Sequence, residues 1–384
     1  MNINNLINCK TTLKIIAILS IILSFQQCKC GVKSVYDTVE GAELHSEEPK
    51  VIDVGDLDIE NAKGLFAKIP NQNVAYFINE KDGKTYKFTE EGGKLVCRES
   101  GALSTSILYG GATGFDSNIS GVFFAGDIQN PTLHCVIVDK TSKKIVDVYT
   151  LRNDQWTWHN AVMHIDLFAD TMCGTTIQLG EKLAGCLCAQ GNDITTGTKA
   201  VKLYSVKDCS STTDPSNEKT LITLQKADGV KLLFENVTSV SQLEAGKILI
   251  GREKSFFLGR VNKLGNQVTL DEKAFASAKQ TLKGGIYHIQ DGNNREPNMS
   301  MPVFFCFSDS PSVYKMISRG EFVPLELPES VPKKHLVIPF SDALYFITSR
   351  TKPKPASEED GTTSTTDDEK ETIYYKTQFN GKLI

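Results

Sequence analysis

Neither sign of charge dominates this sequence. Its 384 residues include 42 lysines and arginines against 46 aspartates and glutamates, which gives a formal net charge of −4 at pH 7. Proteins that bind nucleic acid or an anionic membrane mainly by electrostatics carry a clear basic excess. The charge balance therefore argues against either of them as the main partner.

Long hydrophobic runs are also scarce. The one at the N-terminus, Ile15–Phe25, has 11 residues, which is too short to cross a bilayer, and it follows Lys10 and Lys14. This pattern is typical of a secretory signal peptide. Small residues stand at the −3 and −1 positions before Gly31. We therefore predict that residues 1–30 are a signal peptide, that the mature chain has no transmembrane segment and that the protein is secreted.

Two other interpretations of this N-terminus stay open. Cys28 could be the lipidated cysteine of a bacterial lipoprotein, although Gln27 stands where that signal needs a small residue. Alternatively, the segment could be retained as a signal anchor.

The cysteines do not form an even-numbered framework. An odd count implies at least one free thiol, and several of these residues lie in apolar runs, where they would pack as small buried side chains. Cys186 and Cys188 lie two apart in a predicted strand and so share a face, which suits a common neighbour better than a mutual disulfide. After the predicted signal, the cysteines are Cys97, Cys135, Cys173, Cys186, Cys188, Cys209 and Cys306.

Catalytic and metal-binding motifs are lacking as well. The sequence has no Gly-rich phosphate loop, no nucleophile elbow and no Cys/His pairing with usable spacing. His159 and His164 are five residues apart, a spacing that suits shared metal ligation in neither a helix nor a strand. We assign no catalytic residue, no metal site and no cofactor, and we expect a protein that is not an enzyme.

What the sequence does contain is a recurring hairpin. Residues 73–96 read NVAYFINEKDGKTYKFTEEGGKLV, an apolar run followed by a polar turn and further short strands. Related units begin near residues 73, 120, 182, 246, 301 and 342. Several strands per unit at a period of about 40–60 residues are typical of a β-propeller. We therefore predict an all-β fold, a propeller of six blades with about four antiparallel strands each; a large sandwich or two β-domains is the alternative.

Burial on both faces explains the composition of the central strands. Runs such as AYFI, VFF and LYFI are apolar at odd and even positions alike, as expected of a blade covered by neighbours on each side. The unit resembles blades of outer-membrane and quinoprotein-type propellers, over residues 62–384 and at the level of the fold only. The Trp that often closes such blades, their quinone-binding residues and the Asp-box of sialidases are all missing, so the resemblance implies no specific family.

The ring model divides the chain into parts. We predict a polar, acidic, partly disordered lead at residues 31–61 and a propeller domain at 62–384, in which the first and last units are neighbours. Residues 351–371 are rich in Pro, Thr and acidic side chains and are expected to form a disordered surface insertion.

Two sets of residues are candidates for surface function. Trp156 and Trp158 share a face if their segment is extended, and could stack against a sugar or a peptide; packing at a blade edge is the alternative. Glycosylation is expected only if the secretory route is eukaryotic, at the sequons of Asn118, Asn236 and Asn298.

Export, a repeat ring and the lack of catalytic motifs favour a monomeric, secreted binding module. Its partner would be a protein or a glycan at a cell surface. A propeller-fold carbohydrate hydrolase or lyase is the first alternative, because two carboxylates could converge in a central channel. A lipid-anchored envelope protein is the second.

Overall fold

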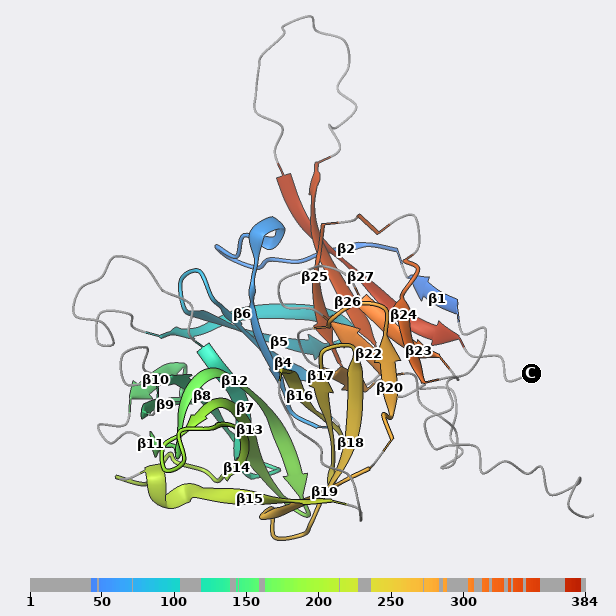
Figure 1. The fold of residues 1–384 in the computed structure, drawn as a ribbon. Coiled ribbons are helices and arrows are strands. Elements are labelled where there is room, and N and C mark those ends of the chain that lie inside the picture. Colours follow the sequence, from blue (N-terminus) through green and yellow to red (C-terminus); the bar gives the residue numbers. More distant parts are fainter. Residues whose placement is uncertain are drawn as a thin grey trace, which may run out of the picture.

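The structure is a computed structural model. It describes residues 43–46, 48–70, 72–103, 119–138, 143, 145–158, 163–213, 215–226, 236–271, 273–282, 286–288, 303–306, 313–317, 320–327, 331–332, 334–340, 343–352 and 370–380. Within these ranges the regular elements are β-strands and two short 3₁₀ helices, η1 (Ile59–Asn61) and η2 (Pro215–Glu218) (Figure 1). The predicted all-β class is confirmed. The predicted signal peptide at 1–30, including Cys28, lies outside the described residues.

Within the described part of the chain, antiparallel pairing between neighbouring strands divides the strands into six successive groups, and three further pairings, one antiparallel and two parallel, join the second to the fifth group into one larger sheet. The first three groups are β3 (Gly64–Lys68), β4 (Val74–Asn79), β5 (Lys84–Glu91) and β6 (Lys94–Ala102); β7 (Ile119–Asp127), β8 (Thr132–Val138), β9 (Ile145–Arg152), β10 (Gln155–Trp158) and β11 (Met163–His164); and β12 (Leu167–Leu179), β13 (Lys182–Asp193), β14 (Lys199–Val206) and β15 (Lys219–Lys226).

The last three groups follow the same plan. They are β16 (Val237–Glu244), β17 (Lys247–Arg252), β18 (Ser255–Val261), β19 (Gln267–Leu270) and β20 (Ala276–Ala278); β21 (Ile286–His288), β22 (Val303–Cys306), β23 (Val313–Ile317) and β24 (Glu321–Pro324); and β25 (Leu336–Pro339), β26 (Leu344–Thr351) and β27 (Lys370–Asn380) with β1 (Glu43–Ser46) and β2 (Lys50–Val51). Most of the predicted hairpins begin on the second strand of a group. The one predicted near residue 120 begins on a first strand, β7, because that strand carries the apolar run.

The central strands are buried on both faces, as predicted. All four residues of β25 are buried, and so are the first five of β26. In β8 the first six residues are buried. A strand in this setting lacks the alternation of a half-exposed sheet, because apolar side chains cover both of its faces.

Clusters of buried apolar side chains join each group to the next. Among the described residues, the clusters link the groups through side chains that include Ile78 and Phe124, Phe123 and Leu187, Cys188 and Ile248, Leu249 and Tyr314, Val313 and Phe346, and Phe77 and Tyr345. The last of these pairs joins the first group to the sixth. Residues far apart in sequence, such as Phe77 and Tyr345, therefore belong to the same apolar cluster.

The N-terminal segment belongs to this junction. β1 and β2 both pair with β27, with Glu43 opposite Asn380 and Lys50 opposite Tyr374 (Figure 1). Ile52, Val54, Leu57 and Ile59 are buried in the cluster that joins the first and sixth groups. The described part of the 31–61 segment, predicted as a lead ahead of the domain, therefore packs as part of the β-structure.

Polar contacts cross the same junction. The carboxylate of Glu90 on β5 accepts hydrogen bonds from Tyr345 Oη and Lys376 Nζ of the sixth group, each at 2.9 Å. The Leu95 N–H donates to Tyr374 Oη at 3.2 Å. Burial opposes ionisation of Glu90, but the bonds from Lys376 and Tyr345 outweigh it and lower its pKa.

The predicted insertion lies between two strands of the sixth group. Thr351 ends β26, and Lys370 and Glu371 begin β27; the intervening residues 353–369 lie outside the described residues. None of the helices in the described ranges has the length and apolar character needed to cross a membrane.

Candidate functional site

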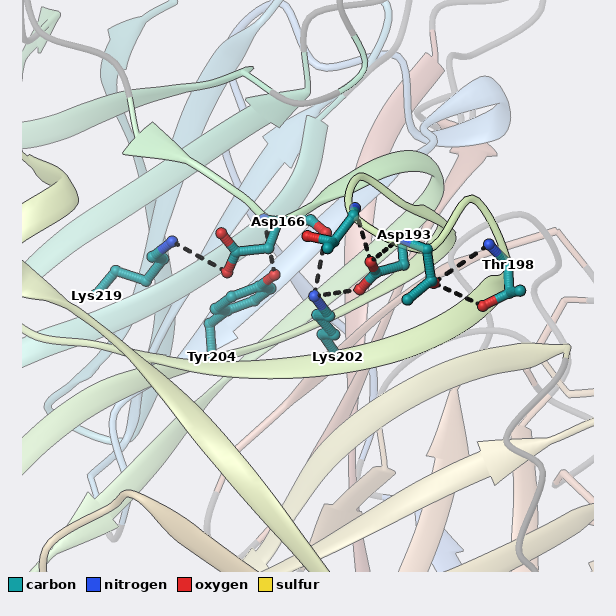
Figure 2. Close-up of polar contacts among 8 residues, drawn as sticks. Asp166, Asp193, Thr198, Lys202, Tyr204 and Lys219 are labelled. Atoms are coloured by element: carbon teal, nitrogen blue, oxygen red, sulfur yellow. Dashed lines mark hydrogen bonds and ion pairs between the residues drawn. The ribbon is translucent and has the colours of Figure 1, made fainter.

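One end of the third group gathers charged side chains. Antiparallel strands alternate in direction, so β12 begins where β13 ends. Leu167 of β12 pairs there with Asp193 of β13, and Asp166 immediately precedes β12. We call Asp166, Asp193, Lys202, Tyr204 and Lys219 the Asp166 cluster (Figure 2).

Between them, the two lysines of this cluster contact both aspartates. Lys202 Nζ lies 2.6 Å from Asp193 Oδ2 and donates to the Asp166 carbonyl oxygen at 3.1 Å. Lys219 Nζ donates to the His164 carbonyl at 2.6 Å and lies 3.8 Å from Asp166 Oδ2. The cluster therefore forms a connected network along β13, β14 and β15 (Figure 2).

The hairpin between β13 and β14 fixes Asp193. Its Oδ1 accepts hydrogen bonds from the N–H groups of Thr195 and Thr196, at 2.8 and 2.9 Å. Gly197 has a φ of 68° and donates to the Asp193 carbonyl at 2.8 Å. An aspartate that bonds the backbone two residues on, followed by a left-handed glycine, is a stable turn. Asp193 therefore has a defined orientation without a ligand.

Asp193 is an anion at neutral pH. The hydrogen bond from Lys202, supported by the turn N–H groups, lowers its pKa to about 2. Tyr204 is buried, and burial raises the pKa of its hydroxyl, which accepts the Asp166 N–H at 3.2 Å. Lys219 Nζ lies 5.0 Å from the centre of the Tyr204 ring. The network thus holds fixed charges and a neutral phenol.

Exposed side chains surround the network. The Asp166 side chain is 58% exposed, although its backbone is held by Tyr204 and Lys202. Phe168 and Ile194 are 40% and 43% exposed, and the Ile194 N–H donates to the Asp166 carbonyl at 3.3 Å. Asp166, Phe168 and Ile194 are thus exposed residues at the same end of the β12–β13 pair.

A close approach of two strands positions Phe168. The pairing of β12 with β13 shifts register between Ala169 and Thr171. A Cβ atom at Gly191 would lie 1.9 Å from the Phe168 carbonyl oxygen, so a residue with a side chain does not fit there. Glycine at this position and the bulge beside it hold Phe168 in place.

The structure places the predicted tryptophans on an outer strand. Trp156 and Trp158 lie on β10, alternate with exposed residues and are partly buried on one face. The indole N–H groups donate within the protein, Trp156 to Thr85 Oγ1 at 2.9 Å and Trp158 to Asp147 Oδ1 at 3.2 Å. Both rings pack against the apolar cluster shared by the first and second groups. The expectation that they share a face agrees with this arrangement, and their role in ligand binding stays a prediction.

A second polar cluster contains a fully buried histidine. His134 stacks on Phe123, and its Nδ1 donates to the Thr132 carbonyl at 2.9 Å. Its Nε2 accepts the Cys209 N–H at 3.0 Å and lies 3.3 Å from Asp208 Oδ1. Burial raises the pKa of Asp208, but the contact with His134 and the hydrogen bonds from Ser210 outweigh it and hold that pKa well below its usual range. This cluster joins the second and third groups and faces the core.

The other predicted sites are mostly outside the described residues. Asn118, Asn298 and His159 fall there. Asn236 is exposed and its amide donates to Glu253 Oε1 at 2.9 Å. Within the ranges that the structure describes, no group of three or more His, Cys, Asp or Glu side chains could hold a metal ion.

Sequence reasoning missed most of the Asp166 cluster. No functional motif of the sequence includes Asp193, Lys202 or Lys219. A local signal did exist, because the stretch DITTG beginning at Asp193 has the composition of a side-chain-stabilised turn. The meeting of Asp193 with Asp166 depends on strand pairing across the group, which local sequence does not encode.

Replacing Lys202 tests the electrostatics of the network. In Lys202→Met, the pKa of Asp193 is expected to rise toward its ordinary value, because its main hydrogen-bond donor is gone. In the wild type, the stability from ionised Asp193 is present above about pH 4 and is lost as the pH falls toward 2. The variant should therefore have a lower free energy of unfolding than wild type at pH 7, and this difference should become smaller below pH 4. Urea unfolding at pH 7, 4 and 2.5 measures this.

The matched control for this experiment is Lys199→Met, an exposed lysine at the start of the same strand. Its effect should be small and independent of pH. The pairing with Asp193 would be contradicted if the difference in the free energy of unfolding between wild type and Lys202→Met stayed constant down to pH 2.5.

No family model and no curated protein matches the chain. Among solved structures, it is similar to a luciferin-regenerating enzyme, with 10% identity over 87% of this chain and 96% of that one and a TM-score of 0.45. It is similar to the Trypanosoma rangeli sialidase, with 9% identity over 82% of this chain and 54% of that one and a TM-score of 0.42. A putative exo-beta-1,3-galactanase from Bifidobacterium bifidum s17 matches at 14% identity over 70% of this chain and 91% of that one, with a TM-score of 0.36. With every TM-score below 0.5, these likenesses carry no argument about activity.

Proposed function

We propose that the chain is a six-bladed β-propeller, in which each antiparallel group is one blade. The apolar clusters between successive groups support a ring, and so does the cluster that joins the sixth group to the first. β1 and β2 would complete the last blade by pairing with β27. A ring gives every sheet a neighbour on both faces, as the buried central strands require.

The propeller acts, in this proposal, as an exported, monomeric binding module. The observation that carries it is the exposure of the Asp166 carboxylate, Phe168 and Ile194 at one end of the β12–β13 pair, where the Asp166 cluster also lies. Apolar side chains bordered by oriented charges are typical of the centre and rim of a protein interface. This favours a protein partner that places an apolar side chain on Phe168 and a cation against Asp166. A glycan is the second ligand class, with Trp156 and Trp158 as its stacking surface.

A double variant tests the Asp166 surface. Asp166→Asn with Phe168→Ser removes the exposed charge and the exposed ring, and we expect at least about a tenfold loss of binding, since interface anchors are worth more than about 1.4 kcal/mol each. The probes are a glycan array and proteins captured from the secreted fraction of the source culture. The control, Asp56→Asn with Leu264→Ser, changes an exposed carboxylate and an exposed apolar residue elsewhere.

The outcomes separate the two ligand classes. A captured protein that binds wild type and control but is lost by the Asp166/Phe168 variant supports the proposal. A glycan lost only by Trp156→Ala/Trp158→Ala moves the site to β10. A ligand that binds wild type and the Asp166/Phe168 variant equally, and the tryptophan variant too, overturns both.

The carbohydrate hydrolase is the alternative. A glycosidase needs one carboxylic acid with a raised pKa as proton donor. Asp193, with a pKa of about 2, does not supply that acid, and we therefore prefer binding as the function of this cluster. Turnover of fluorogenic glycosides that disappears in Asp166→Asn would reverse that preference.

Mass spectrometry of the mature N-terminus tests the proposed export. A chain that begins with free Gly31 supports cleavage of the signal peptide. An acylated Cys28 would instead support the lipid-anchored envelope protein.

A further inference from the structure

Three cysteines lie together on the third group. Cys173 of β12 pairs directly with Cys188 of β13, and Cys186 lies two residues from Cys188 on the same face. Cys173 is the common neighbour that the spacing of Cys186 and Cys188 implied. Cys186 and Cys188 are buried in the apolar cluster between the third and fourth groups, and Cys173 is partly exposed beside them.

The three thiols interact with one another. Cys173 Sγ points to the Cys188 carbonyl oxygen, at 3.9 Å. The hydrogen bond with the Cys173 side chain, together with burial, holds the pKa of Cys188 well above its usual range. Burial raises the pKa of Cys186 to about 12. In the reduced protein the two buried groups are therefore neutral thiols, and Cys173 is the thiol that solvent reaches.

We propose that Cys173 and Cys188 are a thiol–disulfide exchange site that an oxidised dithiol or another small disulfide converts to a cross-strand disulfide. The Cys173 thiolate attacks one sulfur of that disulfide, its S–S bond breaks, and the first thiolate leaves. Cys188 then loses its proton and its sulfur attacks the Cys173 sulfur, which releases the second thiolate. Two electrons pass to the incoming disulfide, which leaves as two thiols.

Strand geometry selects Cys188 over Cys186 as the partner. Directly opposed residues of an antiparallel pair have Cα atoms about 4.5–5.5 Å apart, within the range that a disulfide spans. The diagonal neighbour lies about 7–8 Å away, beyond the reach of a disulfide without backbone movement. Burial of Cys188 makes the second step the slow one, because its thiol must ionise. The site is independent of the binding function proposed above.

Glutathione disulfide is the probe that tests this site. The folded wild-type chain is incubated with it, free thiols are then blocked with N-ethylmaleimide, and the chain is digested with trypsin without reduction. Lys182 separates Cys173 from Cys188, so the bond appears as two linked peptides, with Cys186 carrying the maleimide. We expect this linked pair as the main product in the wild type, and its loss in Cys188→Ser.

Two further variants keep the test informative. Cys186→Ser should form the link as the wild type does, whereas Cys173→Ser should form none. Cys97, partly exposed in the first group, is an internal control that should carry glutathione or maleimide only. The proposal is overturned if Cys173 of the folded wild type stays as a glutathione adduct or a blocked thiol, or if it links to Cys186.

Discussion

A chain that begins at Ala62 is expected not to reach the native state, whereas a chain that begins at Glu43 is expected to fold. The segment between them supplies β1, β2 and four buried side chains, Ile52, Val54, Leu57 and Ile59. Burial of such side chains is worth roughly 1.5–3 kcal/mol each. Their sum is comparable to the whole net stability of a typical domain, about 5–15 kcal/mol. Near-ultraviolet circular dichroism and a thermal melt of the two chains measure the difference.

Point variants keep this prediction falsifiable if the short chain does not express. Leu57→Ala should cost about 2–5 kcal/mol, because Leu57 is 5% exposed and its loss leaves a cavity. Val51→Ala, in the same segment but 63% exposed, should change the free energy of unfolding by less than about 0.5 kcal/mol. Equal and small effects from both variants would show that the segment does not belong to the core.

His134→Ala is expected to be the most damaging single substitution among the histidines that the structure describes, at about 3–5 kcal/mol. The side chain is fully buried, stacks on Phe123 and bonds the backbone at Thr132 and Cys209. The alanine variant leaves a cavity, an unpaired Cys209 N–H and a carboxylate at Asp208 without its neighbour. Urea unfolding at pH 7 gives the change in free energy.

The matched control is His164→Ala. This histidine is exposed, and it bonds the side chains of Ser216 and Lys219 through its backbone N–H and carbonyl. It should change stability by less than about 0.5 kcal/mol. If the two alanine variants unfold at the same urea concentration, the inferred role of His134 between the second and third groups is wrong.

Burial periodicity and turn chemistry are the parts of the fold that the sequence predicted well. The polar turn predicted within residues 73–96 forms at Asp82 and Gly83: Gly83 has a φ of 71° and the Lys84 N–H donates to Asp82 Oδ1 at 3.0 Å. The central strands are buried on both faces where apolar residues run together. These features follow from neighbours in sequence, so a single sequence contains them.

The N-terminal segment was assigned differently because its average composition is acidic. Ile52, Val54, Leu57 and Ile59 are separated by exposed polar residues, and all four point inward. Because most residues of the segment are polar or acidic, its average composition does not reveal the spacing of these four apolar residues. The Asp166 cluster was missed for another reason. Asp166 precedes β12, whereas Asp193 lies on β13 and Lys219 on β15, and the register of strand pairing, which no short stretch specifies, brings them together.

The pairing of β1 and β2 with β27 has a consequence for synthesis. The sixth group is built from both ends of the chain, with Glu43 opposite Asn380. Residues 43–51 and 370–380 come together only after every strand between them has been made, so this pairing is highly non-local. The last junction therefore cannot form on the ribosome before residues 370–380 emerge. Until then the apolar faces of the first and last groups stay uncovered, and a chain cut short at the C-terminus is as vulnerable to aggregation as one that has lost its first strands.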